Sequence, residues 1–191
     1  CPQYLLLTED DYLEQGDRVI ATPVLRRAED SEMLWQGLQA GVIDCLITDH
    51  FLGALPDPGK PRPALKAAEP GIASREVFYP LMADIFFHQR KLDPAILVDV
   101  MASRPAELMG IDDRKGRIAV GMDADLVLMD PKMRWKIADL GQNSRISTLP
   151  YEGWRVQMFN RRTMVRGETV WDGEKIAVDK GFGNYCGTDE E

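Results

Sequence analysis

The sequence predicts a mixed α/β fold, and two observations carry that prediction. First, a helical pattern over residues 31–41 leads directly into a continuous apolar run at residues 42–48. A run of this kind, rich in β-branched residues, is typical of a strand buried on both faces of a parallel sheet. Second, residues 111–191 hold short β patterns separated by glycines. We therefore expect an α/β domain over residues 1–110 and an all-β segment over residues 111–191.

The elements of the first segment are expected in the following order. A short strand covers residues 18–21, and Asp30 and Ser31 offer an N-cap for the helix that ends at Gly41. A proline- and glycine-rich stretch follows residue 50 and predicts a long loop over residues 51–71. Helices are then expected over residues 74–91, 93–102 and 105–109, the second with Asp93 as N-cap and Pro94 at the first helical position.

The second segment contains five strand candidates. A tight hairpin connection is expected at Arg166-Gly167-Glu168. The candidates are residues 115–120, 125–130, 156–159, 163–166 and 169–172.

Charge and composition exclude several classes of function. The net charge of −8 argues against a nucleic-acid partner, which requires a basic face. No run approaches the roughly 18 apolar residues of a membrane span. The three cysteines form no CxxC pair, so a cytoplasmic protein is expected. The chain opens at Cys1 without an initiator Met, so we expect it to be part of a longer protein.

Asp49 and His50 are the strongest candidates for chemistry. They follow the predicted strand and precede the long loop, and in α/β barrels this end of a strand is where catalytic groups gather. An aspartate there can bind a metal through one oxygen and accept a proton through the other. The competing interpretation is that Asp49 only caps the loop, and position alone leaves both open.

Other reactive residue types receive structural interpretations. His88 lies near a helix end and is expected to be structural. Asp123 and Asp125 are expected to form a turn into the next strand rather than a metal site. Cys45 lies inside an apolar run and is expected to fill the core, and Trp35 is expected to anchor its helix by packing.

Six segments, in the same order along the chain, carry a family resemblance. They are Cys1-Pro2-Gln3-Tyr4-Leu5, Thr22-Pro23-Val24-Leu25-Arg26, the run from Leu34-Trp35 to Thr48-Asp49-His50, Gly71-Ile72 with Glu76, Gly121-Met122-Asp123-Ala124-Asp125-Leu126-Val127, and Pro150-Tyr151-Glu152-Gly153-Trp154. Together these segments resemble the cyclic amidohydrolases, the family of dihydroorotase, allantoinase and the hydantoinase/dihydropyrimidinase group.

The resemblance implies a fold, a reaction and a site. The fold would be the C-terminal portion of a (β/α)8 TIM-like barrel, strands 7–8 and the following helices, with part of a small β-sandwich. The reaction would be hydrolysis of a cyclic amide with one or two divalent metals, zinc being the expected ion. Asp49 matches the family aspartate that binds metal and carries a proton, and Thr22, Arg26 and His50 fall at substrate-binding positions.

The departures from the family pattern are equally specific. The family's His-x-His pair, bridging lysine and two further histidine ligands have no counterpart here, so the chain alone should be inactive. Thr22-Pro23-Val24 stands where dihydroorotases have Asn-Pro-Pro, and Phe51-Leu52-Gly53 replaces Ala-Pro-His. These changes favour an allantoin- or hydantoin-like ring over dihydroorotate.

Two other functions stay open at this stage. The protein is either the hydrolase or a non-catalytic homologue that acts as a scaffold or partner subunit. A further alternative is an independent β-rich binding module, in which residues 111–191 would fold alone. The partners expected for the hydrolase are a small cyclic amide and either further copies of the chain or the missing N-terminal part.

Overall fold

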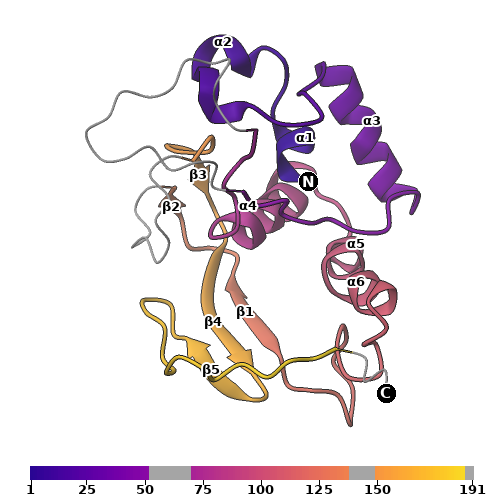
Figure 1. The fold of residues 1–191 in the computed structure, drawn as a ribbon, viewed down its shortest axis with the longest axis vertical. Coiled ribbons are helices and arrows are strands. Elements are labelled where there is room, and N and C mark those ends of the chain that lie inside the picture. Colours follow the sequence, from indigo (N-terminus) through magenta and orange to yellow (C-terminus); the bar gives the residue numbers. More distant parts are fainter. Residues whose placement is uncertain (52–69, 138–148, 188–191) are drawn as a thin grey trace. The chain divides into compact units, whose positions relative to one another are not determined.

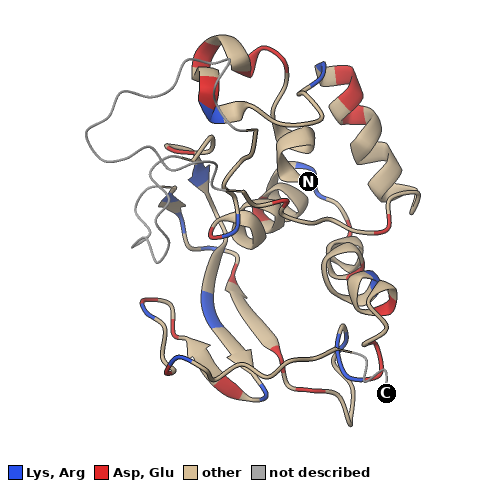
Figure 2. Ribbon diagram, in the orientation of Figure 1, with Lys and Arg blue, Asp and Glu red and all other residues tan. Residues whose placement is uncertain are grey.

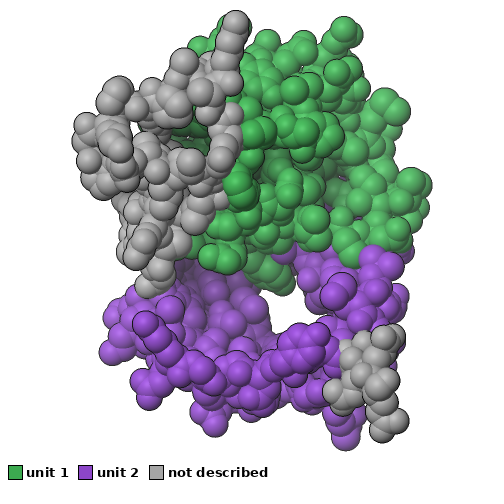
Figure 3. Space-filling view, viewed as in Figure 1, with its two compact units in different colours: residues 1–82, 136–155 green, residues 83–135, 156–191 purple. Residues whose placement is uncertain are grey.

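The computed structural model describes residues 1–51, 70–137 and 149–187 (Figure 1). The predicted loop over residues 51–71 therefore lies almost wholly outside the described residues. The described chain divides into two compact units, coloured separately in Figure 3. Unit 1 comprises Cys1–Met82 and Lys136–Arg155, and unit 2 comprises Ala83–Trp135 and Val156–Glu191. The expected division at residue 110 into a barrel portion and a β-sandwich stays a prediction.

A buried tryptophan joins two helices of unit 1. Trp35 is fully buried, and its indole Nε1–H donates to the Leu5 carbonyl oxygen at 3.0 Å. This bond joins the third helix to the first and confirms that Trp35 anchors its helix by packing. The elements are α1 (Pro2–Leu6), α2 (Asp11–Gln15), the 3-10 turn η1 (Gly16–Val19), α3 (Ala28–Gln39) and the start of α4 (Phe78–Asp84).

The start of α3 differs from the prediction by about one turn. Asp30 is not the N-cap: it lies in the first turn, where its carboxylate accepts from the backbone N–H of Arg27 at 3.2 Å. A carboxylate in a helical first turn is stabilising because the unpaired N–H groups there carry partial positive charge. Hydrogen bonding by Asp30 therefore moves the helix start to Ala28, three residues before the expected one.

Two strand predictions in unit 1 are wrong. Residues 18–21 belong partly to η1 and form no strand. Residues 42–48 are not paired in a sheet, and Val42 and Ile47 are 75% and 55% exposed. A buried parallel strand requires a neighbour on each side, and within the described residues the nearest pairing is a parallel bridge beyond the segment, between His50 and Ile72. Cys45 is accordingly half-buried rather than part of the core.

The helical part of unit 2 agrees with the prediction in outline. Asp93 caps α5 (Pro94–Val98), its carboxylate accepting from Ala95 N–H at 2.9 Å, as expected. The predicted helix over residues 74–91 forms later, as α4 followed by the π-helical turn η3 (Ile85–Gln89). The expected break after residue 102 is absent: a second π-helical turn, η4 (Asp99–Ser103), leads directly into α6 (Arg104–Leu108). Pro105 is the second residue of α6, directly after the π-helical turn.

A three-stranded antiparallel sheet forms the β part of unit 2. Its strands are β1 (Leu126–Asp130), β4 (Phe159–Val165) and β5 (Glu168–Trp171), in the order β1-β4-β5. The hairpin prediction is confirmed, since Arg166 and Gly167 connect β4 to β5 with φ of 51° and 82°. The expected strand over residues 156–159 is split between β3 (Arg155–Val156), which pairs with β2 (Trp135–Lys136), and the start of β4.

The strand expected at residues 115–120 is replaced by a turn held by charges. The Lys115 ammonium contacts the Asp123 carboxylate at 2.8 Å and also pairs with Asp125. Burial opposes the charge of Lys115, but its hydrogen bonds to Asp123 and Asp125 outweigh burial and raise its pKa. Asp125 also accepts from the Arg166 backbone N–H at 2.8 Å, which ties this turn to the β4–β5 connection. Both aspartates therefore serve the turn, as expected.

No helix in the described parts of the chain is long and apolar enough to cross a membrane.

Two glycines of unit 2 offer a matched test of packing behind this turn. Gly116 and Gly121 have nearly equal φ, 93° and 92°, but a Cβ at Gly116 would lie 2.7 Å from Ala106 Cβ, whereas one at Gly121 meets open space. We predict that Gly121→Ala lowers the free energy of unfolding by about 1–2 kcal/mol through backbone strain. Gly116→Ala should lower it by about 1–3 kcal/mol more through overpacking. Urea unfolding monitors both, and equal losses would contradict this packing.

Candidate active site

The Asp49 carboxylate is exposed and held by one buried side chain. Asp49 follows the irregular segment 42–48 and has a φ of 47°, in the left-handed region that few residues other than glycine adopt. Its Oδ2 accepts from the amide Nε2–H of Gln3 at 3.3 Å. Gln3 is only 1% exposed. The backbone thus turns at Asp49, and α1 supplies the group that binds its carboxylate.

His50 is bound to the chain that follows the long loop. Its Nδ1 accepts from the backbone N–H groups of Ser74 and Arg75, both at 3.1 Å. The Ser74 hydroxyl donates in turn to the Thr48 carbonyl oxygen at 3.1 Å. Because Nδ1 accepts two hydrogen bonds, the neutral ring carries its proton on Nε2. Burial lowers the pKa of His50 and the Arg75 guanidinium lowers it further, while Glu76 acts in the opposite direction.

The predicted substrate residues lie at the surface of unit 1. Thr22 and Arg26 are both exposed. The turn that holds them is tied to α1, because the Tyr4 hydroxyl donates to the Pro23 carbonyl oxygen at 2.8 Å. Burial raises the pKa of Tyr4, and the nearby Asp49 charge raises it further. Neighbouring residues of α1, Gln3 and Tyr4, therefore contact Asp49 and the Thr22–Pro23 turn respectively.

Arg26 has an acidic neighbour on α3. Acidic residues gather on α2 (Asp11 and Glu14) and on the first turn of α3 (Glu29 and Asp30), as Figure 2 shows. The Arg26 Nε lies 4.0 Å from Asp30 Oδ2 with both side chains largely exposed. An exposed pair of this kind contributes little to stability. The expected contact of Arg26 with substrate stays a prediction.

Three buried polar atoms, on the partner of Asp49, on His50 and on a residue whose charge acts on His50, have no hydrogen-bond partner among the described residues: Gln3 Oε1, His50 Nε2 and Glu76 Oε1. Sequence reasoning placed Gln3 and Glu76 in family-like segments without giving them a role. The signal that distinguishes them is burial, because an unpaired buried polar atom costs about 1–3 kcal/mol and requires a reason. Burial of this kind depends on tertiary packing and is not visible in sequence.

Asp49 fits one position of a metal site, but no complete site. An exposed carboxylate with one oxygen already held by an amide suits a single bond to zinc. Within residues 1–51, 70–137 and 149–187, no three His, Cys, Asp or Glu side chains gather closely enough to hold an ion. A metal bound at Asp49 would therefore need ligands from elsewhere.

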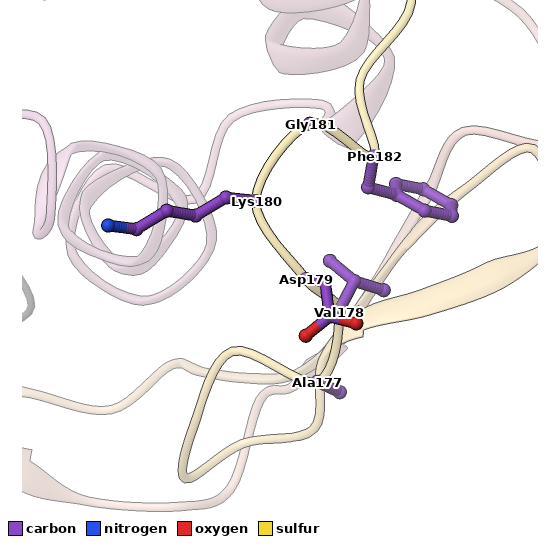
Figure 4. A pocket seen from close by; sticks show the side chains of 6 residues that line it. All are labelled: Ala177, Val178, Asp179, Lys180, Gly181 and Phe182. Carbon is purple, nitrogen blue, oxygen red and sulfur yellow. The ribbon is translucent and has the colours of Figure 1, made fainter.

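A separate hollow in unit 2 offers no comparable chemistry. It has a volume of about 470 Å³ and is lined by residues 177–182. Its charged residues are Asp179 and Lys180, and Figure 4 shows the Lys180 side chain leading away from the Phe182 ring. None of the residues predicted to carry chemistry lines it, so the candidate site remains the surroundings of Asp49.

Comparison with known proteins shows the family to which the chain belongs. The model of the amidohydrolase family matches residues 7–170, and the chain belongs to that family. The chain is 33% identical to an L-hydantoinase of Paenarthrobacter aurescens over 96% of its own length and 40% of the relative. It is 35% identical to a dihydroorotase of Halobacterium salinarum over 94% of its length and 41% of the relative.

Solved structures agree with the sequence comparison. An L-hydantoinase (dihydropyrimidinase) from Arthrobacter aurescens matches with a TM-score of 0.82 and 34% identity, covering 96% of this chain and 41% of that one. A D-hydantoinase from Bacillus sp. AR9 matches with a TM-score of 0.86 and 26% identity over 97% and 41%. The mixed α/β fold and the family predicted from sequence are thus confirmed. The chain spans about two fifths of the length of these relatives.

The hydrogen bonds of His50 give a testable stability difference. His50→Leu should lower the free energy of unfolding by about 1–3 kcal/mol, because the buried Ser74 N–H loses its acceptor. His50→Asn should lower it less, since an asparagine amide oxygen can take the place of Nδ1. Urea unfolding, with hydrogen exchange at the Ser74 amide, measures both variants. Equal losses, or unchanged exchange in His50→Leu, would show that these bonds do not hold the segment.

Proposed function

We propose that this chain carries one side of the active site of a metal-dependent hydrolase that opens a cyclic amide or ureide ring. The observation that carries the proposal is the Asp49 carboxylate, exposed, set at a left-handed backbone position and held by buried Gln3. Membership of the amidohydrolase family and similarity to proteins named hydantoinase and dihydroorotase support it.

We assign Asp49 two roles. It is a ligand of the metal, and it takes a proton from the attacking water. Asp49 would help to hold one or two divalent ions, zinc in our proposal, whose charge would make a water molecule more acidic and so available as the nucleophile near neutral pH. Water attacks the ring carbonyl carbon, the C–N bond breaks, and Asp49 returns the proton to the leaving nitrogen. A carboxylate that faces solvent can exchange that proton in both steps.

We propose a hydantoin- or allantoin-like substrate rather than dihydroorotate. The turn at Thr22 lacks the Asn-Pro-Pro sequence of dihydroorotases, and Phe51 follows His50 where they have alanine. Thr22 and Arg26 would contact the substrate from the turn that Tyr4 ties to α1. His50 would contact substrate through Nε2–H, because Nδ1 already accepts from the backbone; Nε2 is buried in this structure, so it would have to become exposed when substrate binds.

We propose that the remaining metal ligands come from polypeptide outside these 191 residues, so that this chain is the C-terminal portion of a (β/α)8 barrel together with part of a β-sandwich. The exposed apolar side chains of Val42 and Ile47 on unit 1 fit this arrangement, because neighbouring barrel strands would bury them. The supplying polypeptide is the N-terminal part of the same protein, and the hydrolase is a cytoplasmic homo-oligomer. Below, this chain together with the polypeptide that completes the site is called the assembled enzyme.

The main test is hydrolysis by the assembled enzyme. With zinc, it should open hydantoins or allantoin faster than dihydroorotate. Asp49→Asn should lower kcat by about 10²–10⁴-fold, the usual contribution of general acid–base catalysis. Asp10→Asn, an exposed aspartate of the same unit, should leave kcat unchanged. If the assembled enzyme hydrolysed none of the hydantoins, allantoin and dihydroorotate, or if Asp49→Asn kept full activity, the proposal would be refuted.

A second test uses the 191-residue chain by itself. Because its described residues hold no set of three metal-binding side chains, it should retain no stoichiometric zinc after dialysis and should hydrolyse none of the same rings. Zinc is measured by elemental analysis against protein concentration. One tightly bound zinc per chain, or hydrolysis by the chain alone, would contradict an incomplete site.

The alternative is a non-catalytic homologue that serves as a scaffold or partner subunit. The observation in its favour is that no three His, Cys, Asp or Glu side chains gather to hold an ion in the described part of the chain. The two functions separate in the same experiment, because a scaffold would assemble stably and yet bind no zinc and open no ring.

A further inference from the structure

Gln3 occupies a position that is costly for the fold. Its side chain is buried to 1% exposure at the first turn of α1, and its Oε1 has no hydrogen-bond partner among the described residues. A buried amide oxygen without a donor is destabilising, and an apolar side chain of similar volume would avoid that cost. Stability therefore does not account for glutamine here.

The nitrogen of the Gln3 amide gives a reason for glutamine at this position. Nε2–H faces Asp49 Oδ2 at 3.3 Å, across 46 residues of sequence. Only the nitrogen can face a carboxylate, because the amide oxygen would be repelled by it. The bond joins α1 to an exposed aspartate on irregular backbone.

We propose that Gln3 is a positioning residue for Asp49: its amide holds Oδ2 and so fixes the plane of the carboxylate for the metal and for proton transfer. The inference rests on the function proposed above. Groups that orient metal ligands typically change metal affinity or activity 10–100-fold when removed. Gln3 would act through Asp49 and would touch neither metal nor substrate.

The experiment measures zinc affinity and stability of the assembled enzyme in parallel. Gln3→Leu removes the donor and fills the space with apolar atoms. Gln3→His retains a ring N–H that can donate. Gln15→Leu is the matched control, because Gln15 Nε2 donates to Asp11 Oδ1 at 3.0 Å in the same unit, so it breaks a glutamine–aspartate bond of the same kind away from Asp49. Zinc affinity is measured by competition with a chelating dye, and stability by urea unfolding of the zinc-free protein.

We expect Gln3→Leu to weaken zinc binding about tenfold or more and to lower kcat, with no loss of stability in the zinc-free protein. Gln3→His should bind zinc within about threefold of the unsubstituted protein, and Gln15→Leu within about twofold. A merely structural glutamine would give the reverse pattern, a less stable zinc-free protein with unchanged zinc affinity, and that result would overturn the inference.

The two proposals fail in different ways. If the unsubstituted assembled enzyme binds no zinc and opens no ring, the proposed function is wrong and the role of Gln3 falls with it. If that enzyme binds zinc and Gln3→Leu binds it equally well, only the role of Gln3 is wrong.

Discussion

The Asp49 carboxylate is placed by hydrogen bonds from two distant parts of the chain, and the candidate site depends on that constraint. Gln3 of α1 donates to the carboxylate itself, while His50, the next residue, accepts from the backbone of Ser74 and Arg75. Among the described residues, the pairing recorded for residues 48–51 is an isolated bridge from His50 to Ile72. The side-chain hydrogen bonds of Gln3 and His50 therefore help to hold this segment in place.

Under the proposed function, this arrangement would let the chain carry one part of an active site whose other part lies on further polypeptide. Among the described residues, Asp49 is held by Gln3 of α1, and its neighbour His50 by the bridge to Ile72 and the bonds from Ser74 and Arg75, all within unit 1. A metal site requires several ligands at once, and in our proposal Asp49 is one of them. Side chains that prepare a carboxylate and side chains that complete the metal site can thus lie on separate stretches of polypeptide.

The predictions that succeeded depended on local chemistry. The cap of α5 at Asp93, the Arg166-Gly167 turn and the helical character of α3 follow from side chains a few residues apart, which sequence shows directly. The prediction of a strand at residues 42–48 was wrong because an apolar run favours burial but does not determine which strands will pair with it. The prediction of a strand at residues 115–120 was wrong because Lys115 pairs with Asp123 and Asp125. These ion pairs form only in the folded chain.

The candidate site was predictable to a similar degree. Asp49 and His50 could be singled out from their place after the apolar run, while the roles of Gln3 and Ser74 could not, since each contacts its partner across more than 20 residues. Hydrogen bonds of that span leave no periodic pattern in sequence. The residues that hold the Asp49 carboxylate therefore cannot be identified from the sequence around Asp49.

Binding of the metal by Asp49 in the assembled enzyme can be observed directly. The measurement is a crystal structure of that enzyme with zinc, in which the ion is located by its anomalous scattering. We expect a zinc ion with an Asp49 carboxylate oxygen about 2.0–2.2 Å away. A fully occupied zinc site whose ligands exclude Asp49, or an assembled enzyme that binds no zinc, would contradict it.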